Sequence, residues 1–318
     1  MDDFKELFVS QKGDQDFETI GEALEAAKRF SDREVIIHIK EGTYRERLVV
    51  SQDHITFFGV PDKTIIVYGV SAFDIHADGE KMGTFRTPSV FIDADYFKAS
   101  NVTFINDAGQ GEKAGQALAV YADGDHLIFE GCRFLGYQDT LFAAPLPLKE
   151  MQPGGFRGPK EFAPRKMGRH YYKDCYISGN VDFIFGGATA LFENCEIFSR
   201  NKEGECKGYV TAPSTFEEVE FGFVFLKCRF TSDCPERSCY LGRPWRNYAK
   251  TVILESEIGA HIKEEGFHDW NKKEAWDTMY FAEYKNTGVG ATGKRAPFVH
   301  ELTDEEALKY TRENILGW

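Results

Sequence analysis

The segment "ALFENCEIFS", residues 190–199, shares its pattern of residue types with three other segments of the chain. In each, an apolar pair precedes two mostly polar or small residues, a cysteine, any residue and an apolar residue. The other three are "LIFEGCRFLG" (127–136), "HYYKDCYISG" (170–179) and "FVFLKCRFTS" (223–232). Residues 98–106 and 251–259 fit the same frame with Val102 and Ser256 in place of the cysteine.

The spacing of these positions indicates a solenoid. The intervals lie between 20 residues, from Cys175 to Cys195, and 43 residues, from Cys132 to Cys175. Repeats of this length, built from short strands and turns, bury their apolar faces only against neighbouring repeats. The sequence therefore predicts an all-β fold, a parallel β-helix, and the 28 phenylalanines among 318 residues favour strands as well. A column of small, usually buried cysteines is then core filling rather than redox chemistry.

The two ends of the chain differ from the repeats. Residues 16–30 have a threonine near their start and apolar residues at helical spacing, which predicts a short helix that caps the first coil. Residues 303–318 open at Thr303 with acidic residues in the first turn, which predicts a C-terminal helical tail. Because no Pro/Gly/Ser linker divides the chain into halves, we expect a single domain over residues 1–318.

Composition restricts the classes of function. A formal net charge of −13 argues against nucleic acid or an anionic membrane as the main partner. No apolar run approaches the ~20 residues of a membrane span, and the opening "MDDFKELFVSQ" lacks the features of a signal peptide. As the chain stands this predicts a cytoplasmic protein, or a secreted one if a signal peptide has been trimmed from its start.

The seven cysteines include no C-x-x-C pair, so neither a full disulfide framework nor a zinc ribbon is indicated. Cys206, Cys228, Cys234 and Cys239 have irregular spacings, which makes a metal site built from them a weak alternative. A local disulfide between Cys234 and Cys239 is an alternative in an exported protein.

Two aspartates occupy the same place in the repeat. Asp139 follows Cys132 by seven residues, and Asp182 follows Cys175 by seven. In stacked coils the two carboxyl groups face each other, since neighbouring strands lie ~4.8 Å apart. Like charges at that separation do not both ionise freely, so one group keeps its proton while the other is an anion. We favour catalysis over a calcium site or a pair of turn-capping acids, because few further carboxylates lie nearby.

The direction of Asp182 is predicted from strand alternation. Val181, Phe183 and Phe185 are expected to point into the coil, which sends the intervening Asp182 to the outer face.

A basic insertion separates the aspartates. Residues 143–169 are rich in proline and glycine and carry six basic residues against two acidic ones. Such a charge run is usually solvated surface. Its place between the aspartates favours a loop that grips an acidic ligand, for which Arg157 and Lys160 are candidates.

Five stretches in order along the chain resemble the pectinesterases, or pectin methylesterases, a family of right-handed parallel β-helix enzymes. They are "EGTYRERLVV" (41–50), "NVTFINDAGQGEKAGQALAV" (101–120), "GYQDTLF" (136–142), "DFIFGGATALFENC" (182–195) and "YLGRPWRNYAKTV" (240–252). The resemblance covers nearly the whole chain. It implies removal of C6 methyl esters from galacturonate units of homogalacturonan or its oligosaccharides by a monomeric enzyme, with no metal and no cofactor.

The same resemblance implies roles for single residues. Asp182 is the nucleophile and Asp139 the general acid and base, while Arg243 orients the Asp182 carboxylate. Gln116 and Gln138 donate hydrogen bonds to the oxyanion.

The resemblance also implies substrate contacts. Trp245 lines the sugar subsite, and Phe142 stands at a subsite position where the family often has tyrosine. Gln138 and Asp139 are adjacent, so ideal alternation sends them to opposite faces unless the strand ends there or a bulge intervenes.

The sequence leaves three rival functions to be weighed. A polygalacturonase-type glycosidase also uses paired acids, but two glutamines and an arginine suit acyl transfer better than an oxocarbenium ion. A hydrolase of another ester or thioester keeps the aspartates and Arg243 and changes the cleft aromatics. A carbohydrate-binding β-helix without activity is disfavoured because every expected catalytic group is present. The absence of a G-x-S-x-G elbow argues against a serine hydrolase.

Overall fold

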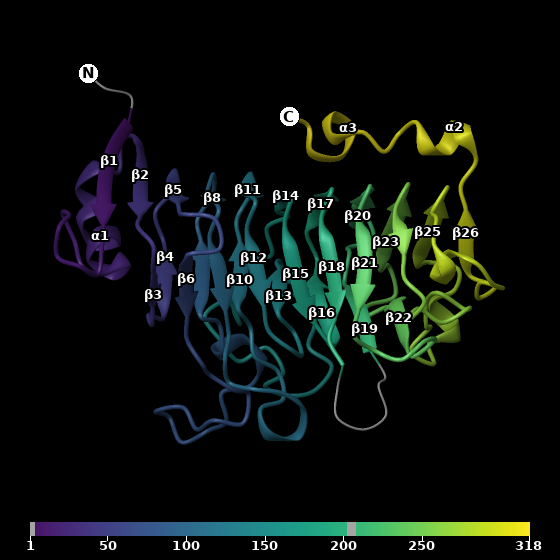
Figure 1. Cartoon of the computed structure of the whole chain (residues 1–318). Helices are drawn as coiled ribbons and strands as arrows, with labels where there is room; N and C mark the ends of the chain where they lie inside the picture. Colours follow the sequence, from purple (N-terminus) through teal and green to yellow (C-terminus); the bar gives the residue numbers. More distant parts are fainter. Residues whose placement is uncertain (1–3, 202–207) are drawn as a thin grey trace.

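The computed structural model describes residues 4–201 and 208–318 and confirms the predicted parallel β-helix. Within these residues the strands form three parallel sheets, here called A, B and C, and each runs along the axis of the coil (Figure 1). The chain passes from sheet C to A to B and then begins the next coil. Each strand therefore pairs with the strand one coil earlier and the strand one coil later.

Sheet A contains β1 (Phe4–Val9), β2 (Glu34–Ile39), β5 (Ile55–Phe58), β8 (Lys98–Ser100), β11 (Leu127–Glu130), β14 (Arg169–Lys173), β17 (Thr189–Glu193), β20 (Phe223–Leu226), β23 (Lys250–Leu254), β25 (Tyr280–Tyr284) and β26 (Val299–Glu301). Sheet B contains β3 (Gly42–Tyr44), β6 (Thr64–Val67), β9 (Thr103–Ile105), β12 (Arg133–Leu135), β15 (Tyr176–Gly179), β18 (Glu196–Ser199), β21 (Arg229–Ser232) and β24 (Glu257–Ile258). Sheet C contains β4 (Leu48–Val50), β7 (Val90–Asp93), β10 (Val120–Asp123), β13 (Leu141–Ala143), β16 (Val181–Gly186), β19 (Gly208–Pro213) and β22 (Cys239–Gly242). The α-helices are α1 (Ile20–Ala27), α2 (Asp304–Ala307) and α3 (Arg312–Leu316), and single 3₁₀ turns cover Lys28–Phe30, Thr84–Arg86, Gly111–Lys113, Lys273–Ala275 and Val289–Ala291.

The repeated cysteines lie at the corner between sheets A and B. Cys132, Cys175, Cys195 and Cys228 are at most 2% exposed, and the backbone N–H of Cys175 donates to Sγ of Cys195 in the next coil. The residue before each anchor has a positive φ, which turns the chain sharply from one sheet to the next; these are Asn101, Gly131, Asp174, Asn194, Lys227 and Glu255. The cysteine column is therefore core filling at a recurring turn, as predicted.

Stacked aromatic rings fill the interior of the coil. Phe129, Tyr172, Phe192 and Phe225 lie on successive strands of sheet A with ring centroids 4.5–5.0 Å apart and nearly parallel planes. A ring at the same place in each coil repeats the same offset-stacked contact. This stack uses three of the 28 phenylalanines as core filling.

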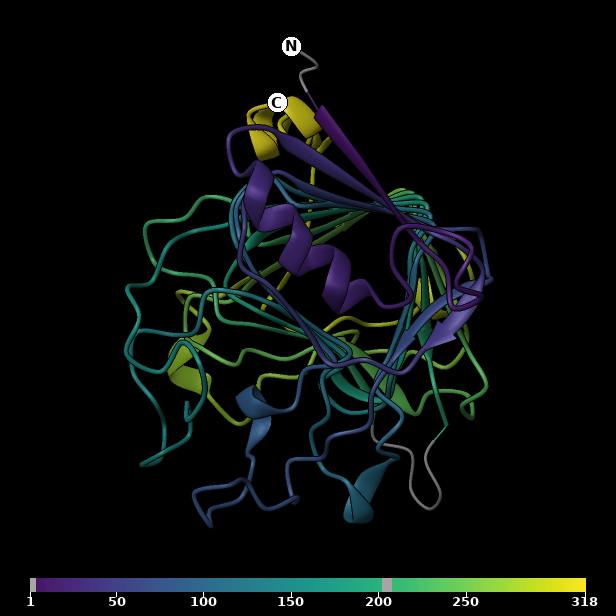
Figure 2. The same cartoon turned by 90° about the vertical axis from the view of Figure 1, so that its left-hand side faces the viewer.

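Helix α1 closes the N-terminal end of the coil, as predicted (Figure 2). Thr19 accepts a hydrogen bond from the backbone N–H of Glu22, and the Glu22 carboxylate accepts one from the backbone N–H of Thr19, which forms a capping box. Ile20, Ala23 and Ala27 face the core. The helix thereby covers apolar surface that no preceding coil buries.

The C-terminal tail is helical, but residues 303–318 do not form one helix. Thr303 caps α2 as predicted, whereas Thr311 caps a separate helix, α3. Between them Tyr310 is buried against the outer face of sheet A, and Ile315 and Leu316 of α3 join the same apolar cluster. A continuous helix lacks this contact, so packing against sheet A decides the break. The tail runs back along the coil from β26 (Figure 1).

Candidate active site

A cleft of about 360 Å³ lies over the outer face of sheet C. Phe185 of β16 and Ala212 of β19 lie in its floor, and loops that leave the coil form its walls. Its remaining lining residues are Thr84, Phe85, Gln116, Gln138, Asp139, Met151, Gln152, Gly155, Phe156, Asp182, Arg243, Trp245, Arg246 and Trp270. The cleft thus collects residues from eight separate segments of the chain.

The two predicted aspartates lie in adjacent coils and both face this cleft. Strand β13 pairs with β16 in a register that sets Leu141 opposite Ile184, so Asp139 and Asp182, each two positions earlier in the chain, correspond. The backbone N–H of Asp139 donates to the carbonyl of Val181 at 3.0 Å. Both side chains are nearly buried, at 8% and 7% exposure. The repeat frame therefore predicted their alignment correctly.

Backbone conformation directs both aspartates into the cleft. Asp139 has φ +62° and Asp182 has φ +50°, a left-handed region that aspartate tolerates better than most residues. Strand β13 begins only at Leu141, so Gln138 and Asp139 precede the regular alternation and both line the cleft. Gln138 and Asp139 can therefore both face the cleft although they are adjacent, because the strand starts only after them.

The predicted inward direction of Phe185 is wrong. Phe183 and Ile184 both belong to the interior core, whereas Phe185 lines the cleft with Asp182. The pairing of β16 with β19 shifts register between Val181 and Ile184, which marks a bulge at the aspartate. The bulge makes the spacing between outward residues three instead of two. Simple alternation therefore fails at the functional residue.

Arg243 holds the carboxylate of Asp182 with two parallel hydrogen bonds. Its Nε donates to Oδ1 at 2.9 Å and its Nη2 donates to Oδ2 at 2.7 Å. Both side chains are largely buried, at 16% and 10% exposure. Such a bidentate, charge-assisted pair fixes the orientation of the carboxylate as well as its charge.

The pair of carboxyl groups is electrostatically asymmetric. Burial raises the pKa of Asp139 well above its usual range, and the neighbouring Asp182 charge raises it further. Burial also raises the pKa of Asp182, but the hydrogen bonds and the charge of Arg243 oppose that rise. Of the two groups, Asp139 therefore holds its proton more readily, and Asp182 is the one that ionises more readily.

Gln116 and Gln138 lie opposite each other on adjacent coils. A parallel β-bridge joins them, and their backbone carbonyls accept hydrogen bonds from Ala72 and Ala117. Both side chains line the cleft, and within residues 4–201 and 208–318 neither amide group has a hydrogen-bond partner. These amides are available to a bound molecule, while the backbone that carries them is fixed.

Trp245 lies at the cleft as predicted, but Phe142 does not. Trp245 packs near Phe85 and Phe185, with ring centroids 6.4 and 5.7 Å away. Phe142 is fully buried beneath these rings, at 0% exposure. It supports the aromatic floor and does not line the cleft, so the structure gives it no exposed surface for the predicted subsite contact. Strand β13 sends Phe142 outward, and the rings of the surrounding loops cover it.

The two basic residues of the insertion that were predicted to bind a ligand, Arg157 and Lys160, do not line the cleft. Arg157 pairs with Glu80 at 2.9 Å, and Lys160 pairs with both Asp93 and Asp123. Neither lines the cleft. Their charges are paired with acids of the protein itself, so they do not form the predicted grip on an acidic ligand. The insertion contributes uncharged residues to the cleft wall instead: Met151, Gln152, Gly155 and Phe156.

The described residues gather no group of three or more His, Cys, Asp or Glu side chains in a metal-binding arrangement. Cys206, one member of the alternative cysteine site, lies outside the described residues. No helix in the described part of the chain has the length and apolarity required to cross a membrane.

A scan against protein families finds one match, a model described as Pectinesterase, over residues 6–146 and 164–317. The chain belongs to the pectinesterase family. Among solved structures it is similar to pectin methylesterase from carrot, with a TM-score of 0.83 and 31% identity over 98% of this chain and 92% of that one. Pectin methylesterase PemA from Erwinia chrysanthemi has a TM-score of 0.80 and 29% identity over 98% and 97% of the two chains.

Two curated relatives of this family member come from Arabidopsis thaliana. Pectinesterase 31 from Arabidopsis thaliana is 34% identical over 97% of this chain and 91% of its own length. Probable pectinesterase/pectinesterase inhibitor 23 from the same plant is 35% identical over 97% of this chain but only 51% of its own length, so this chain spans about half of that relative. The residues that the family model leaves out, 147–163, form the centre of the predicted insertion. The insertion is therefore the part of this pectinesterase that departs most from the family pattern.

Several cleft residues escaped sequence reasoning. Phe85 and Trp270 lie in irregular segments without a motif, and Phe156 lies in an insertion that was analysed for its charges. Tyr209 stacks on Arg243 from β19 and does not line the cleft. Phe85, Phe156 and Trp270 share one signal, an aromatic residue in a long connection between strands, and it becomes useful only once the connection is known to reach the cleft.

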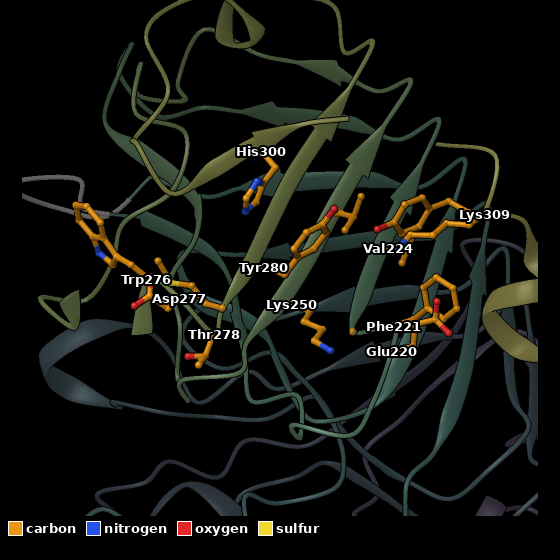
Figure 3. A pocket seen from close by; sticks show the side chains of 14 residues that line it. Glu220, Phe221, Val224, Lys250, Trp276, Asp277, Thr278, Tyr280, His300 and Lys309 are labelled. Carbon is orange, nitrogen blue, oxygen red and sulfur yellow. The ribbon is translucent and has the colours of Figure 1, made fainter. Parts of the chain in front are cut away.

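A second hollow of about 600 Å³ lies on the outer face of sheet A, beneath the C-terminal tail. Tyr280 lies in the middle of the view, between His300 and Lys309, with Lys250 below it (Figure 3). Its two acids, Glu220 and Asp277, lie at opposite sides of the view and form no facing pair. None of the predicted catalytic residues lines this hollow. Of these two hollows in the described part of the chain, the cleft on sheet C is the one that contains the paired aspartates with Arg243.

Proposed function

We propose that this pectinesterase-family enzyme hydrolyses the C6 methyl esters of galacturonate units in pectin or pectic oligosaccharides and releases methanol. The observation that carries the proposal is the Asp182 carboxylate, held by two hydrogen bonds from Arg243 beside Asp139, whose pKa is raised by burial and by the Asp182 charge. The family match supports the same activity. So does similarity to a structure described as pectin methylesterase in complex with hexasaccharide VII, at a TM-score of 0.79 and 29% identity.

The first half of the reaction transfers the acyl group to the enzyme. An Asp182 oxygen attacks the ester carbonyl carbon, and the carbonyl oxygen becomes an oxyanion. The side-chain N–H groups of Gln116 and Gln138 donate hydrogen bonds to it; one such preorganised donor is worth about 2.7–4 kcal/mol in a known hydrolase. The C–O bond to the methoxy group then breaks, and Asp139 gives its proton to the departing oxygen. Methanol leaves, and an anhydride joins Asp182 to the sugar.

The second half returns the enzyme to its starting state. Asp139 is now a carboxylate, and its raised pKa makes it an effective base. It accepts a proton from a water molecule while the water oxygen attacks the acyl carbon of the sugar. The bond between that carbon and Asp182 breaks, and Asp182 departs as a carboxylate that Arg243 binds. The sum is ester plus water to acid plus methanol, with Asp139 protonated again.

The cleft surface suits a sugar chain with neutral ester groups. Trp245, Phe156 and Trp270 present aromatic rings to the cleft, and apolar ring faces pack well on the C–H faces of sugars. Arg246 lines the same cleft and is half-buried, with Nη2 bound to the carbonyl of Lys149. Its positive charge favours a neighbouring unit that has already lost its methyl group.

Two rival reactions differ in their products. A polygalacturonase-type glycosidase cuts the polymer and leaves the esters intact, while a hydrolase of another ester or thioester leaves methyl esters untouched. The arginine fork favours an anionic nucleophile that attacks a carbonyl, since it stabilises a carboxylate in one fixed orientation. It supplies no acid for a glycosidic oxygen.

The test measures methanol and chain length together on highly methylated homogalacturonan. The proposal predicts methanol equimolar with new carboxyl groups and no change in polymer size by size-exclusion chromatography. A fall in chain length without methanol would establish the glycosidase. The absence of both products, together with hydrolysis of acetyl or thioester substrates, would establish the other rival.

A further inference from the structure

Two aromatic rings enclose the guanidinium group of Arg243. Its Cζ lies 3.8 Å from the ring centroid of Tyr209 and 3.7 Å from that of Trp270. A cation in contact with the face of an aromatic ring is attracted by the ring quadrupole. With rings on its faces, the guanidinium group has its N–H edge directed at Asp182, where both hydrogen bonds form.

Tyr209 is fixed by the neighbouring coil. It pairs with Tyr240 of β22, and the two rings stack with centroids 5.4 Å apart and an interplanar angle of 11°. His268 packs edge-on against both rings. Because Tyr209 does not line the cleft, its contact with the reaction runs only through Arg243.

Trp270 is held in a strained backbone conformation. Its φ of +53° is an outlier for a bulky aromatic residue, and such a conformation persists only where the surrounding structure maintains it. The backbone N–H of Trp270 donates to Nδ1 of His268 at 2.9 Å. Nζ of Lys272 donates to the carbonyls of Pro244 and Trp245, which ties this segment to the one that carries Arg243. The fold thus maintains a strained residue where its ring meets the guanidinium group.

We propose that Tyr209 and Trp270 are positioning residues that hold the plane of Arg243 in alignment with Asp182 through the whole reaction. The inference rests on the proposed function, in which Asp182 is the nucleophile. The proposed mechanism also gives a reason why two aromatic rings, rather than one, contact the guanidinium group of Arg243. While Asp182 is acylated its carboxylate charge is absent, and Arg243 is a largely buried cation without its anion. The two ring faces then hold the guanidinium group until the carboxylate forms again.

Tyr209 provides the cleaner test, because Trp270 also lines the cleft and can touch substrate. Tyr209→Leu removes the ring, and Tyr209→Phe keeps it. We expect Tyr209→Leu to lower kcat about tenfold, equal to about 1.4 kcal/mol, with KM within twofold of wild type. The acidic limb of its kcat profile moves to higher pH, because a misaligned Arg243 opposes protonation of Asp182 less. Tyr209→Phe keeps both kcat and the profile.

A second measurement does not depend on turnover. In an Asp139→Asn background, NMR titration of the Asp182 carboxyl carbon reports its pKa without the coupled neighbour. Tyr209→Leu is expected to raise that pKa, and Tyr209→Phe to leave it unchanged. If wild-type enzyme releases no methanol, the proposed function fails, while the titration still decides the positioning role.

Three results would overturn the inference. They are a Tyr209→Leu enzyme with wild-type kcat and pH profile, a Tyr209→Phe enzyme as impaired as Tyr209→Leu, and an effect confined to KM. If Tyr209→Leu does not fold, as judged by thermal melting, Tyr209→Met replaces it, because methionine keeps the bulk and lacks the aromatic face. The same outcomes then apply to that variant.

Discussion

Replacing Arg243 by lysine keeps the charge and removes the fork. The structure gives Arg243 two hydrogen bonds to Asp182, of 2.9 and 2.7 Å, and two stacked rings. Lysine is a point donor that restores at most one of these hydrogen bonds and none of the flat stacking. A hydrogen bond to a charged group contributes about 1.5–3 kcal/mol and a desolvated cation–π contact about 2 kcal/mol. Because the lysine ammonium group replaces part of these interactions, we expect transition-state stabilisation to fall by about 2–4 kcal/mol, which lowers kcat/KM about 30-fold to 1000-fold.

The assay is methanol release from methylated oligogalacturonides across a pH series, with Arg229→Lys as the control. Arg229 donates to Glu196 on the exposed side of sheet B and does not line the cleft, so its replacement should leave kcat/KM within twofold. For Arg243→Lys the acidic limb should also move to higher pH, because the weaker partner leaves the pKa of Asp182 higher. A kcat/KM within threefold of wild type at every pH would refute the argument that the fork geometry matters.

Two further predictions concern the neighbours of this pair. Asp139→Asn should lower kcat more than 100-fold, since no acid protonates methanol. Asp139→Asn should also raise the melting temperature at pH 8 but not at pH 4. The pKa of Asp139 is higher in the folded than in the unfolded protein, so Asp139 makes folding less favourable as the pH rises above the pKa of the unfolded chain. Equal effects of the substitution at both pH values would contradict the raised pKa. Lys160→Ala should raise KM several-fold with little change in kcat, since Lys160 bridges Asp93 and Asp123 and thereby anchors the loop that carries Phe156 into the cleft. Lys166→Ala in the same loop is its control, and an unchanged KM for Lys160→Ala would show that the anchor is dispensable.

The fold was predictable because its signal repeats. Each coil must turn from sheet A to sheet B at the same place, so a small buried residue recurs there and sets the frame. The same frame aligned Asp139 with Asp182 across the insertion. The helix break at Thr311 was not predictable, because packing of Tyr310 on sheet A decides it.

The finer geometry of the site depends on features that the strict alternation of side chains along a strand does not predict. A bulge at Asp182 turns Phe185 to the outside, and loops from elsewhere in the chain cover Phe142. The positive charge of the insertion did not identify ligand-binding residues, because Lys160 forms ion pairs with acidic residues on two other coils. Trp270 depends on a strained turn that no local pattern announces.

The most direct test of the account replaces the nucleophile alone. Asp182→Asn keeps the shape of the side chain and removes its negative charge, and Asp174→Asn is the matched control, since Asp174 lies in the same coil with a similar positive φ but is exposed. Methanol release from a methylated oligogalacturonide should fall below about one part in a thousand of wild type for Asp182→Asn, in a protein that is still folded by circular dichroism at the assay temperature, and stay near wild type for Asp174→Asn. A folded Asp182→Asn enzyme that retains more than a few per cent of the wild-type rate would contradict an aspartyl nucleophile.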